Sequence, residues 1–557
     1  MKKKLFKIFL LLFGIFLIAI VFSSLSFRQK INRNPLPSYY KKGVYHLHSN
    51  FSDGRGTIDE ICRDARSQGL DFVILTDHGR PNLQASAATA WLHDVLLIGA
   101  SEFSLHAGHL AAVGYHVPDY IFPPEAQEAI AEVERDGGVS FIAHPLDRKI
   151  PWTNWQVHGF TGIEILSLYQ MAKKNLLVGM TFLPLRYLFN ADYALTTLIS
   201  YPEKEMLIWD RFNRAGKYFG IFALDSHAKL QISKNVSLHF PSYGATFRIL
   251  NLYVKVERDG ASDAPSAAAA IISALRRGDF FNVIESLAPA NGFENYYREK
   301  NGRQIAMGGD AQGPGGDVIF KLPFNFPVDV VVKKDGEIFK TVRSNKAQEL
   351  IIPITRGGVY RSEISLSSGH FKKLPWIMTN PIYIARPATE AAAAKTLNGP
   401  SLAFFENIFQ VEKNGASSAA ICLDGGHGQG TVTGLAFTLR PDPDGKPDFW
   451  VALAFRQNTA TAGYHGFVFE TSASAPMRCW LQFRTGSGSG EAAYQHSFLA
   501  TEQWRQVAIP FSNFHRLYGQ PGTTAPAAID AVFFLIDNGN AYPGACGEIF
   551  FRQVGLY

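Results

Sequence analysis

The stretch Gly43-Val44-Tyr45-His46-Leu47-His48-Ser49-Asn50-Phe51-Ser52-Asp53-Gly54 decides the interpretation of the chain, because a short apolar run ends there in two histidines. Successive side chains of an extended backbone point to opposite faces, so His46 and His48 lie on the same side. Both imidazoles can therefore reach one ion. The same stretch supplies a carboxylate, Asp53, a few residues later.

Other apolar runs end in the same kind of polar residue. The runs at residues 72–75, 95–98, 139–142 and 219–223 are followed by His78, Glu102 with His109, His144, and Asp225 with His227. Between the runs, residues 58–68 and 125–135 have helical composition, and glycines 69 and 137 fit helix C-terminal ends. Strand and helix alternate from residue 43 to about 287, which predicts a parallel α/β fold, most simply a barrel.

The carboxyl ends of the strands of a parallel barrel open onto one face, so these side chains are expected to converge. Imidazole and carboxylate together suit Zn, Mn or Fe ions, and nine ligands exceed the four of one tetrahedral ion. Two or three ions would polarise a bound water and favour hydrolysis, most naturally of a phosphoester. The predicted metal ligands are His46, His48, Asp53, His78, Glu102, His109, His144, Asp225 and His227.

Nearby residues receive other roles. We expect Asp77 to orient His78 rather than to bind metal. His106 and His116 follow the same strand as His109 and are alternatives to it, while His93 and His158 are expected outside the site.

In their order along the chain, the motifs His-x-His-Ser…Ser-Asp-Gly, Thr-Asp-His, the strand-end Glu, Ala-His-Pro and Asp-x-His resemble the polymerase and histidinol phosphatase (PHP) superfamily. The resemblance covers residues 43–287 and implies a distorted (β/α)₇ barrel with a trinuclear phosphoesterase site. It implies one ion held by His46, His48, Glu102 and Asp225, a second sharing Glu102 and taking His109 and His144, and a third held by Asp53, His78 and His227. The catalytic candidates are the metal-bound water, Asp53 and His227. Arg80, Arg148 and Lys149 follow ligand-bearing strands and are candidates for substrate binding or ordinary solvated surface.

The N-terminus carries Lys2, Lys3, Lys4 and Lys7 before an apolar run from residue 8 to 22. This order predicts a signal anchor in residues 1–30, a single transmembrane helix, in preference to a cleaved secretory signal. We expect the bulk of the protein to face the periplasm or the outside of the cell, or to be secreted if cleavage occurs. One disulfide among Cys422, Cys479 and Cys546 would be compatible with that compartment.

The rest of the chain is predicted as a linker at 31–42, a hydrolase domain at 43–290, a small immunoglobulin-like β domain at 305–385, a linker at 386–400 and a β-sandwich at 401–557. The β domain has a clear hairpin signal, Asp335-Gly336, between residues 328–334 and 337–342. Residues 169–200 interrupt the barrel pattern and predict extra core helices, or a lid or membrane-resting helix. The last domain is similar to galactose-binding jelly rolls and carbohydrate-binding modules. Trp450, Trp480 and Trp504 are therefore candidates for a sugar platform, although most are expected in the core.

Composition limits the function classes. The chain of 557 residues is 46% hydrophobic and 18% charged, so it has enough apolar surface to fold, and its net charge of +6 gives no nucleic-acid footprint. The sequence favours a membrane-anchored, metal-dependent phosphoesterase with a phosphorylated substrate and a glycan as a further candidate partner. The alternatives are a metal-dependent amidohydrolase or lactonase, and a non-catalytic glycan-binding protein of the cell envelope.

Overall fold

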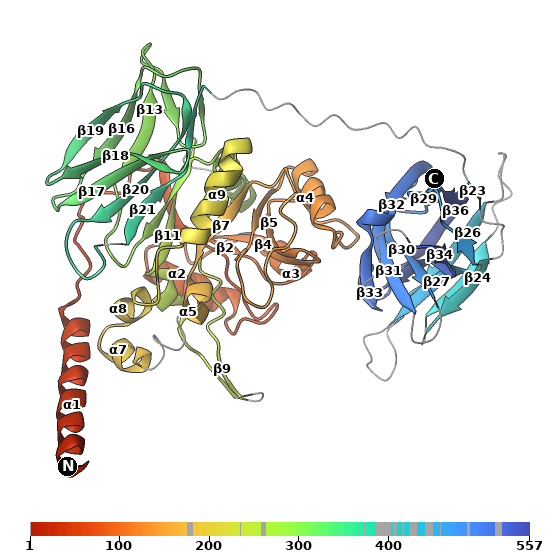
Figure 1. The fold of residues 1–557 in the computed structure, drawn as a ribbon, viewed down its shortest axis with the longest axis horizontal. Coiled ribbons are helices and arrows are strands. Elements are labelled where there is room, and N and C mark those ends of the chain that lie inside the picture. The colour runs from red at the N-terminus through yellow and green to blue at the C-terminus, as the bar shows by residue number, and fades with distance from the viewer. Residues whose placement is uncertain are drawn as a thin grey trace. The chain divides into compact units, whose positions relative to one another are not determined.

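The computed structural model describes residues 2–174, 182–233, 236–257, 263–372 and 374–385 of the N-terminal part (Figure 1). In the C-terminal part it describes residues 403–404, 409–414, 417–422, 432–440, 449–456, 458–486, 491–518 and 526–557. Contacts between Cα atoms divide the chain into two units, Met1–His116 with Val133–Glu390 and Val117–Glu132 with Ala391–Tyr557. The predicted linker at 386–400 lies entirely outside the described residues.

The first unit contains the barrel, whose strands are apolar and buried as predicted. They are β1 (Tyr40–Tyr45), β2 (Phe72–Leu75), β4 (Val95–Leu105), β5 (Gly108–Val113), β6 (Val139–Ile142), β7 (Gly162–Ser167) and β8 (Phe219–Ala223), with β3 (Ala90–Leu92) beside β4. β1 begins inside the segment predicted as a linker. The neighbours β1–β2, β2–β4, β6–β7 and β7–β8 pair in parallel.

One barrel strand runs against the others, which corrects the prediction of a parallel fold throughout. β4 continues three residues past Glu102 to Leu105, turns, and returns as β5, which is antiparallel to both β4 and β6. Glu102 therefore lies inside a long strand rather than at a strand end. Because β5 reverses direction once, β4 and β6 point the same way, and the ends of β1, β2, β6 and β8 still share one face.

β8 returns to β1 and brings the two ends of the barrel together. Leu224 N–H donates to Tyr45 O at 3.1 Å, Asp225 N–H to His46 O at 2.7 Å, and Leu47 forms a parallel bridge with Ser226. β11 (Leu250–Lys255) pairs antiparallel with β1, and β12 (Phe280–Ile284) pairs antiparallel with β11. This closure places the residues after β1 and β8 side by side.

Helices surround the barrel where the sequence has amphipathic segments. They are α2 (Ile58–Ser67), α3 (Leu83–Ser86), α5 (Leu168–Lys174), α7 (Leu183–Phe189), α8 (Ala191–Thr196), α9 (Glu203–Ala215), α10 (Tyr243–Phe247) and α11 (Ala264–Arg277). Helix α4 (Ala126–Arg135) belongs for most of its length to the second unit. A capping box, Thr57 with Glu60, starts α2 as its sequence allows. The predicted extra helices within 169–200 are α5, α7 and α8, while residues 175–181 lie outside the described part.

The small β domain joins the barrel through a shared sheet. β21 (Pro375–Thr379) pairs with β12, and β15 (Asp310–Ala311), β17 (Val328–Lys334), β18 (Glu337–Ser344), β20 (Gly358–Leu366) and β22 (Ile382–Ile384) extend the same sheet. A separate sheet contains β13 (Glu294–Arg298), β14 (Gln304–Ala306), β16 (Asp317–Leu322) and β19 (Gln348–Pro353). The predicted hairpin is confirmed, since Asp335 and Gly336 turn β17 into β18 with positive φ angles of 53° and 91°.

The N-terminal segment forms a helix, α1 (Lys2–Ser26), whose C-terminal end packs against the first unit. Phe27 is buried, and its ring lies 5.5 Å from Tyr193 and 5.6 Å from Phe371. No helix among the described residues is both long enough and apolar enough to cross a membrane. A short hairpin, β9 (Leu230–Ser233) with β10 (Val236–Leu238), follows the barrel's last strand.

The second unit is a two-sheet β-sandwich. One sheet has the order β25-β26-β36-β29-β32 with β23 beside β36, and the other has the order β24-β27-β35-β30-β31-β33, with β28 and β34 forming a further pair. The strands are β23 (Ala403–Phe404), β24 (Phe409–Lys413), β25 (Ser418–Cys422), β26 (Thr433–Thr438), β27 (Trp450–Phe455), β28 (Thr459–Ala460), β29 (Gly466–Ala473), β30 (Met477–Thr485), β31 (Ala492–Ala500), β32 (Arg505–Pro510), β33 (His515–Tyr518), β34 (Ala528–Ile529), β35 (Ala531–Asp537) and β36 (Cys546–Leu556). Phenylalanines from both sheets fill its core.

The tryptophans and cysteines of this sandwich are placed as follows. Trp480 is buried and donates through Nε1 to Asp537 at 2.9 Å, so it belongs to the framework of the domain. Trp450 and Trp504 are half-buried, and the Arg552 guanidinium lies over the Trp504 ring. Cys479 and Cys546 are free thiols. Sugar binding through this domain stays a prediction.

Candidate metal centre

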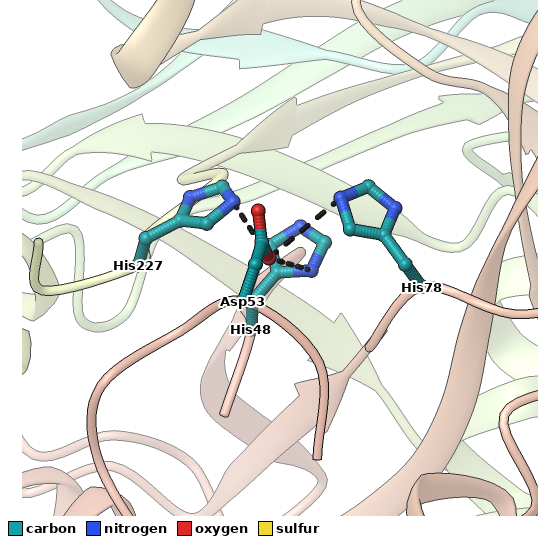
Figure 2. A group of neighbouring side chains, drawn as sticks. All are labelled: His48, Asp53, His78 and His227. Atoms are coloured by element: carbon teal, nitrogen blue, oxygen red, sulfur yellow. Dashed lines mark ion pairs between the residues drawn. The ribbon is translucent and has the colours of Figure 1, made fainter. Parts of the chain in front are cut away.

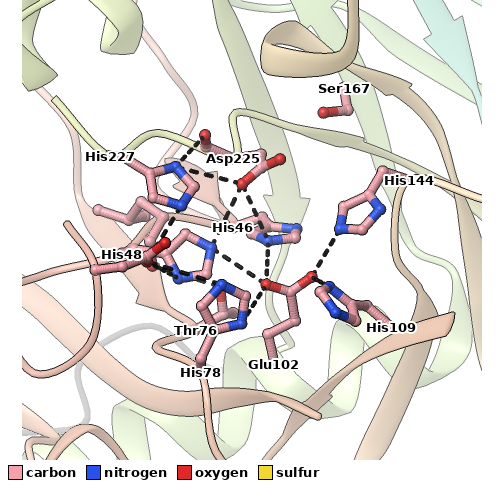
Figure 3. Close-up of polar contacts among 12 residues, drawn as sticks. His46, His48, Thr76, His78, Glu102, His109, His144, Ser167, Asp225 and His227 are labelled. Atoms are coloured by element: carbon pink, nitrogen blue, oxygen red, sulfur yellow. Dashed lines mark hydrogen bonds and ion pairs between the residues drawn. The ribbon is translucent and has the colours of Figure 1, made fainter. Parts of the chain in front are cut away.

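Six barrel strands deliver the predicted ligands to one place (Figure 3). His46 and His48 follow β1, His78 follows β2, Glu102 lies on β4, His109 on β5, His144 follows β6, and Asp225 and His227 follow β8. Asp53 comes from the loop after β1. All nine side chains contact at least one other member of the group, although they are spread over 182 positions of sequence from His46 to His227.

Glu102 is the centre of the group, and its side chain is 1% exposed. Five imidazoles surround its carboxylate. His109 Nδ1 and His144 Nε2 lie 2.8 Å from Oε1, whereas Oε2 lies 3.2 Å from His78 Nδ1, 3.3 Å from His48 Nε2 and 3.4 Å from His46 Nε2. One carboxylate with different histidines on each oxygen has the geometry of a ligand shared between ions.

Asp53 organises a second subgroup on the open side (Figure 2). Its Oδ1 lies 3.2 Å from His227 Nε2 and 3.7 Å from both His48 Nδ1 and His78 Nε2. The Asp53 side chain is 52% exposed, whereas Glu102 and His48 are buried. This subgroup contains the three residues expected for the third ion, with His48 added.

Asp225 links the two subgroups. Its Oδ1 lies 3.4 Å from His48 Nε2, 3.7 Å from His46 Nε2 and 3.6 Å from His227 Nδ1. Potential ligand atoms of His46, His48 and Glu102 lie within 4.8 Å of one another, as do those of His46, His144 and Asp225, and those of His78, Glu102 and His109. The first set matches three of the four residues expected for the first ion, whereas His78 lies nearer to Glu102 and His109 than expected.

The residues fit a divalent metal because buried nitrogen and oxygen atoms in the cluster lack hydrogen-bond partners. Among the described residues these atoms include His46 Nε2, both ring nitrogens of His48, His78 Nδ1, Glu102 Oε2 and His144 Nδ1. A buried polar atom without a partner destabilises a fold by about 1–3 kcal/mol, so several converging ones need a compensating ligand. Cations bound among these nitrogens and oxygens would supply it.

The charges in the cluster lead to the same conclusion. Burial raises the pKa of Glu102, but the surrounding imidazoles outweigh burial and hold that pKa well below its ordinary value. The pKa of Asp225 and of Asp53 is lowered in the same way, mainly by His48 and by His227 respectively. Burial lowers the pKa of His48, yet Asp225 and Glu102 raise it to about 9. Two buried carboxylates, Glu102 and Asp225, and the half-exposed Asp53 therefore favour positive charge among them, which either protons or cations can supply.

Glu164, which sequence reasoning did not select, supports the cluster from behind. It lies on β7, is 1% exposed, and its Oε1 lies 2.5 Å from His46 Nδ1, while Oε2 accepts the His144 backbone N–H at 2.8 Å. Because Nδ1 of His46 is held this way, Nε2 is the nitrogen that faces the cluster. The signal was present in the sequence, since an acidic residue inside an apolar strand needs a buried partner.

Asp77 acts differently from the prediction. Its carboxylate accepts Ser49 N–H at 2.8 Å and Ser49 Oγ–H at 2.7 Å, and it also accepts the Ser52 hydroxyl, rather than contacting His78. It therefore shapes the loop that carries Asp53. Gly54 completes this loop, because a Cβ there would lie 2.1 Å from the His48 carbonyl oxygen.

Several site residues have strained backbones. His46, His144 and Asp225 are non-glycine residues with positive φ angles of 63°, 27° and 50°. Such conformations cost about 1–3 kcal/mol each and persist only where surrounding structure enforces them. The backbone therefore leaves ideal geometry at the points where strands deliver ligands.

A cavity of about 610 Å³ opens beside the cluster and is lined by His144, Glu164, Ser167 and Arg148, among others. Arg148 and Lys149 also line this cavity and are exposed to solvent, and their role in substrate binding stays a prediction. Arg80 is half-buried and does not line this cavity. Tyr169 is exposed, and its ring lies 5.3 Å from that of His227.

Comparison with known proteins agrees with the site. Residues 45–131 match the family model of the PHP domain. A search of the curated proteins found no match to the chain.

Two kinds of solved structure resemble parts of this chain. A two-domain protein from Bacteroides vulgatus, described as containing a predicted PHP-like metal-dependent phosphoesterase, is 14% identical, with a TM-score of 0.33, covering 64% of this chain and 99% of its own. The family 11 carbohydrate-binding module of the Clostridium thermocellum cellulase Lic26A-Cel5E is 15% identical, with a TM-score of 0.24, covering 28% of this chain and 95% of its own. Neither likeness is close enough to assign an activity. The segment that matches this family model carries His46, His48, Asp53, His78, Glu102 and His109, and the fold brings these residues together with His144, Asp225 and His227.

Proposed function

We propose that the chain is a metal-dependent hydrolase of phosphate esters. The observation that carries the proposal is Glu102, buried among five imidazoles, with several cluster atoms left without partners. Bound divalent cations would lower the pKa of a water and hold phosphoryl oxygens. His46, His48, Asp53, His78, Glu102, His109, His144, Asp225 and His227 would hold them.

The chain's own residues define an inner and an outer part of this site. Glu102, His46 and His48 are buried and fix the position of the site. Asp53 and His227 lie 3.2 Å apart on the more exposed side, where solvent and a leaving group can reach them. We assign positioning of the reacting water to this pair. A purely structural metal site would be closed by four ligands and would not need an exposed acid and base.

The first experiment tests the reaction class. The purified full chain, stripped with a chelator and supplied with Mn²⁺ or Zn²⁺, should hydrolyse phenyl phosphate or diphenyl phosphate and return to background when metal is removed. A carboxylic ester, a lactone and an amide form the comparison panel. Turnover of that panel without any turnover of phosphate esters would replace the proposal with the amidohydrolase or lactonase alternative.

The second experiment tests the residue that carries the proposal. Glu102→Gln should lower both bound metal and phosphate-ester turnover by about 100-fold or more, because it removes a charge shared by five histidines. Glu285→Gln is the matched control, since Glu285 is also a buried carboxyl group of the same unit and contacts Lys42 and Tyr253 instead. Full activity of Glu102→Gln would overturn the assignment.

An extracytoplasmic location is part of the proposal, and it rests on the basic and apolar order of residues 1–30, which is typical of a signal anchor. A periplasmic reporter fused after Ile384 should be active in cells, and a cytoplasm-restricted reporter at the same position should be inactive. The opposite result would reverse the orientation.

A further inference from the structure

The 610 Å³ cavity beside the metal centre is large enough for much more than a phosphate group. Its lining includes His144 and Glu164, and His144 Nε2 lies 2.8 Å from Glu102 Oε1. The cavity is therefore adjacent to the cluster. A phosphoester bound at the metals would place the rest of its structure in this space.

The walls of the cavity are rich in positive charge. They include five basic side chains from three separate elements, namely the loop after β6, helix α5 and the first turn of α9: Arg148, Lys149, Lys173, Lys174 and Lys204. All five residues are exposed to solvent. Three elements that are distant in sequence thus present cations to one space.

Two of the three acidic residues of the cavity are already hydrogen-bonded to neighbouring groups. Asp147 accepts the backbone N–H groups of Lys149 at 2.6 Å and Ile150 at 3.0 Å, and it pairs with Lys173 at 3.3 Å. Burial raises the pKa of Asp147, but these hydrogen bonds outweigh it and lower the pKa to about 2. Glu164 is held by His46 and by the His144 N–H. Glu205 is the remaining acid of the lining.

The other four cations remain available. Arg148, Lys149, Lys174 and Lys204 form no ion pair with any described residue. Clustered like charges repel one another unless an anion lies between them, so this arrangement favours an anionic ligand. Guanidinium and ammonium groups bind phosphate and carboxylate oxygens through charge-assisted hydrogen bonds.

We infer that the substrate is a phosphoester whose remaining part carries a second anionic group, a phosphate or a carboxylate, bound by the basic wall of this cavity. The inference rests on the proposed function for the reacting phosphate and adds the chemical class of the substrate. Lys174 and Lys204 lie on different helices and are the pair we assign to the second anion.

The test uses substrates that differ only at the far end of one chain. Butyl phosphate, 4-(phosphonooxy)butanoate and butane-1,4-diyl bisphosphate share one leaving-group structure, and an eight-carbon series varies the reach. With the metal-loaded full chain, at least one substrate with a second anionic group at its far end should exceed the alkyl phosphate of the same length by about tenfold in kcat/KM. A preference for the bisphosphate alone identifies phosphate as the second group. An equal preference for the bisphosphate and for the carboxylate-bearing phosphate shows that either anion is accepted. Equal kcat/KM values for charged and uncharged chains would overturn the inference.

Variants locate the second anion. Lys174→Gln combined with Lys204→Gln should reduce the preference for the charged chains at least fivefold. Lys340→Gln combined with Lys346→Gln is the control, because both are exposed lysines of the β domain, and it should keep the parent preference. An unchanged preference in the first double variant would remove these lysines from the assignment.

A binding measurement separates this inference from the proposed function. By calorimetry, butane-1,4-diyl bisphosphonate should bind at least about fivefold more tightly than butylphosphonate, and the Lys174 and Lys204 double variant should lose the difference. If no phosphate ester is hydrolysed, the proposed function fails, and this comparison alone decides whether the cavity binds a second anionic group. Equal binding of the two phosphonates would overturn the inference even when phosphate esters are hydrolysed.

Discussion

At the scale of single residues, Glu164 is the positioning residue with the clearest consequence. It touches His46 Nδ1 and the His144 backbone, but it lies behind the ligands. Glu164→Gln keeps the shape and removes the charge that orients the imidazole. We expect metal affinity to fall about tenfold to 100-fold.

This loss is measured by competition with a chelator, followed by phosphate-ester turnover at saturating metal. A positioning role predicts that excess metal restores much of the turnover. If Glu164→Gln binds metal as tightly as the control Glu285→Gln, the charge of Glu164 does not contribute to metal binding and the side chain only fills space.

Asp279 gives a pH dependence that is independent of the metal centre. Burial raises its pKa to about 6, and its Oδ1 has no hydrogen-bond partner among the described residues. Because the folded state binds this proton more tightly than the unfolded state, stability falls as the pH rises from about 4 to 6. A shift of two pKa units corresponds to about 3 kcal/mol of the free energy of unfolding.

We therefore expect Asp279→Asn to raise the Tm at pH 8 and to have little effect at pH 4. Thermal melts of the parent and the variant across this range measure the difference between them. A difference that stays constant with pH would show that the carboxyl group does not titrate as argued.

At the scale of elements, the loop from His48 to Gly54 connects packing to the metal centre. Asp77 accepts hydrogen bonds from Ser49 and Ser52 and so fixes the path of the loop toward Asp53. Asp77→Ala should lower the free energy of unfolding by about 1–3 kcal/mol, because buried donors lose their acceptor. It should also weaken metal binding by misplacing Asp53.

Thermal melts and metal titration check the two effects together. Ser67→Ala, at an exposed hydroxyl of α2 that donates to a backbone carbonyl, is the control and should change neither quantity appreciably. Unchanged metal affinity in Asp77→Ala would separate the loop from the site.

The elements show which parts of this fold a single sequence can predict. β2, β6 and β8 begin and end where their apolar runs do, because each is a short buried strand between polar residues. The continuation of β4 to Leu105 and the reversal into β5 depend on pairing between strands, which no local pattern records. The nine-residue cluster was predictable because strand direction places strand ends on one face.

The parts of the site that the sequence missed are those that depend on long-range partners. Glu164 was visible only as an acid in an apolar strand, and its partner His46 is 118 positions away. Asp77 was assigned to His78 because they are adjacent in sequence, whereas the fold turns its carboxylate toward Ser49. The basic cavity combines α5 and α9 with the loop after β6, and neither helix carries a motif.

At the scale of the whole molecule, the barrel and the β domain form one unit through more than the shared sheet. Arg361 on β20 donates from Nε and Nη2 to Asp210 on α9, both at 2.7 Å, and from Nη1 to Glu363 at 2.6 Å. Arg361 is 3% exposed and its guanidinium also lies over the Trp209 ring. Removing one partner of such a buried pair leaves the other charge buried without a counterion.

Arg361→Met should therefore destabilise the first unit by about 3–5 kcal/mol, with barrel and β domain unfolding in one transition. Calorimetry measures both the shift and the number of transitions. Arg343→Met, which removes an exposed pair with Asp329 at 3.6 Å, should cost less than about 1 kcal/mol. Independent melting of the β domain in Arg361→Met would contradict the single unit.

The position of β36 imposes an order on the synthesis of the second unit. Residues 546–556 lie between β26 and β29 in the middle of their sheet, yet they are the last strand of the domain to leave the ribosome. Until they emerge, β26 and β29 lack the neighbour that joins them, and the phenylalanines between the sheets cannot be enclosed. Nascent chains would therefore hold more than a hundred unfolded, aromatic-rich residues until β36 has emerged, which makes this domain a natural client for chaperones that bind emerging polypeptides.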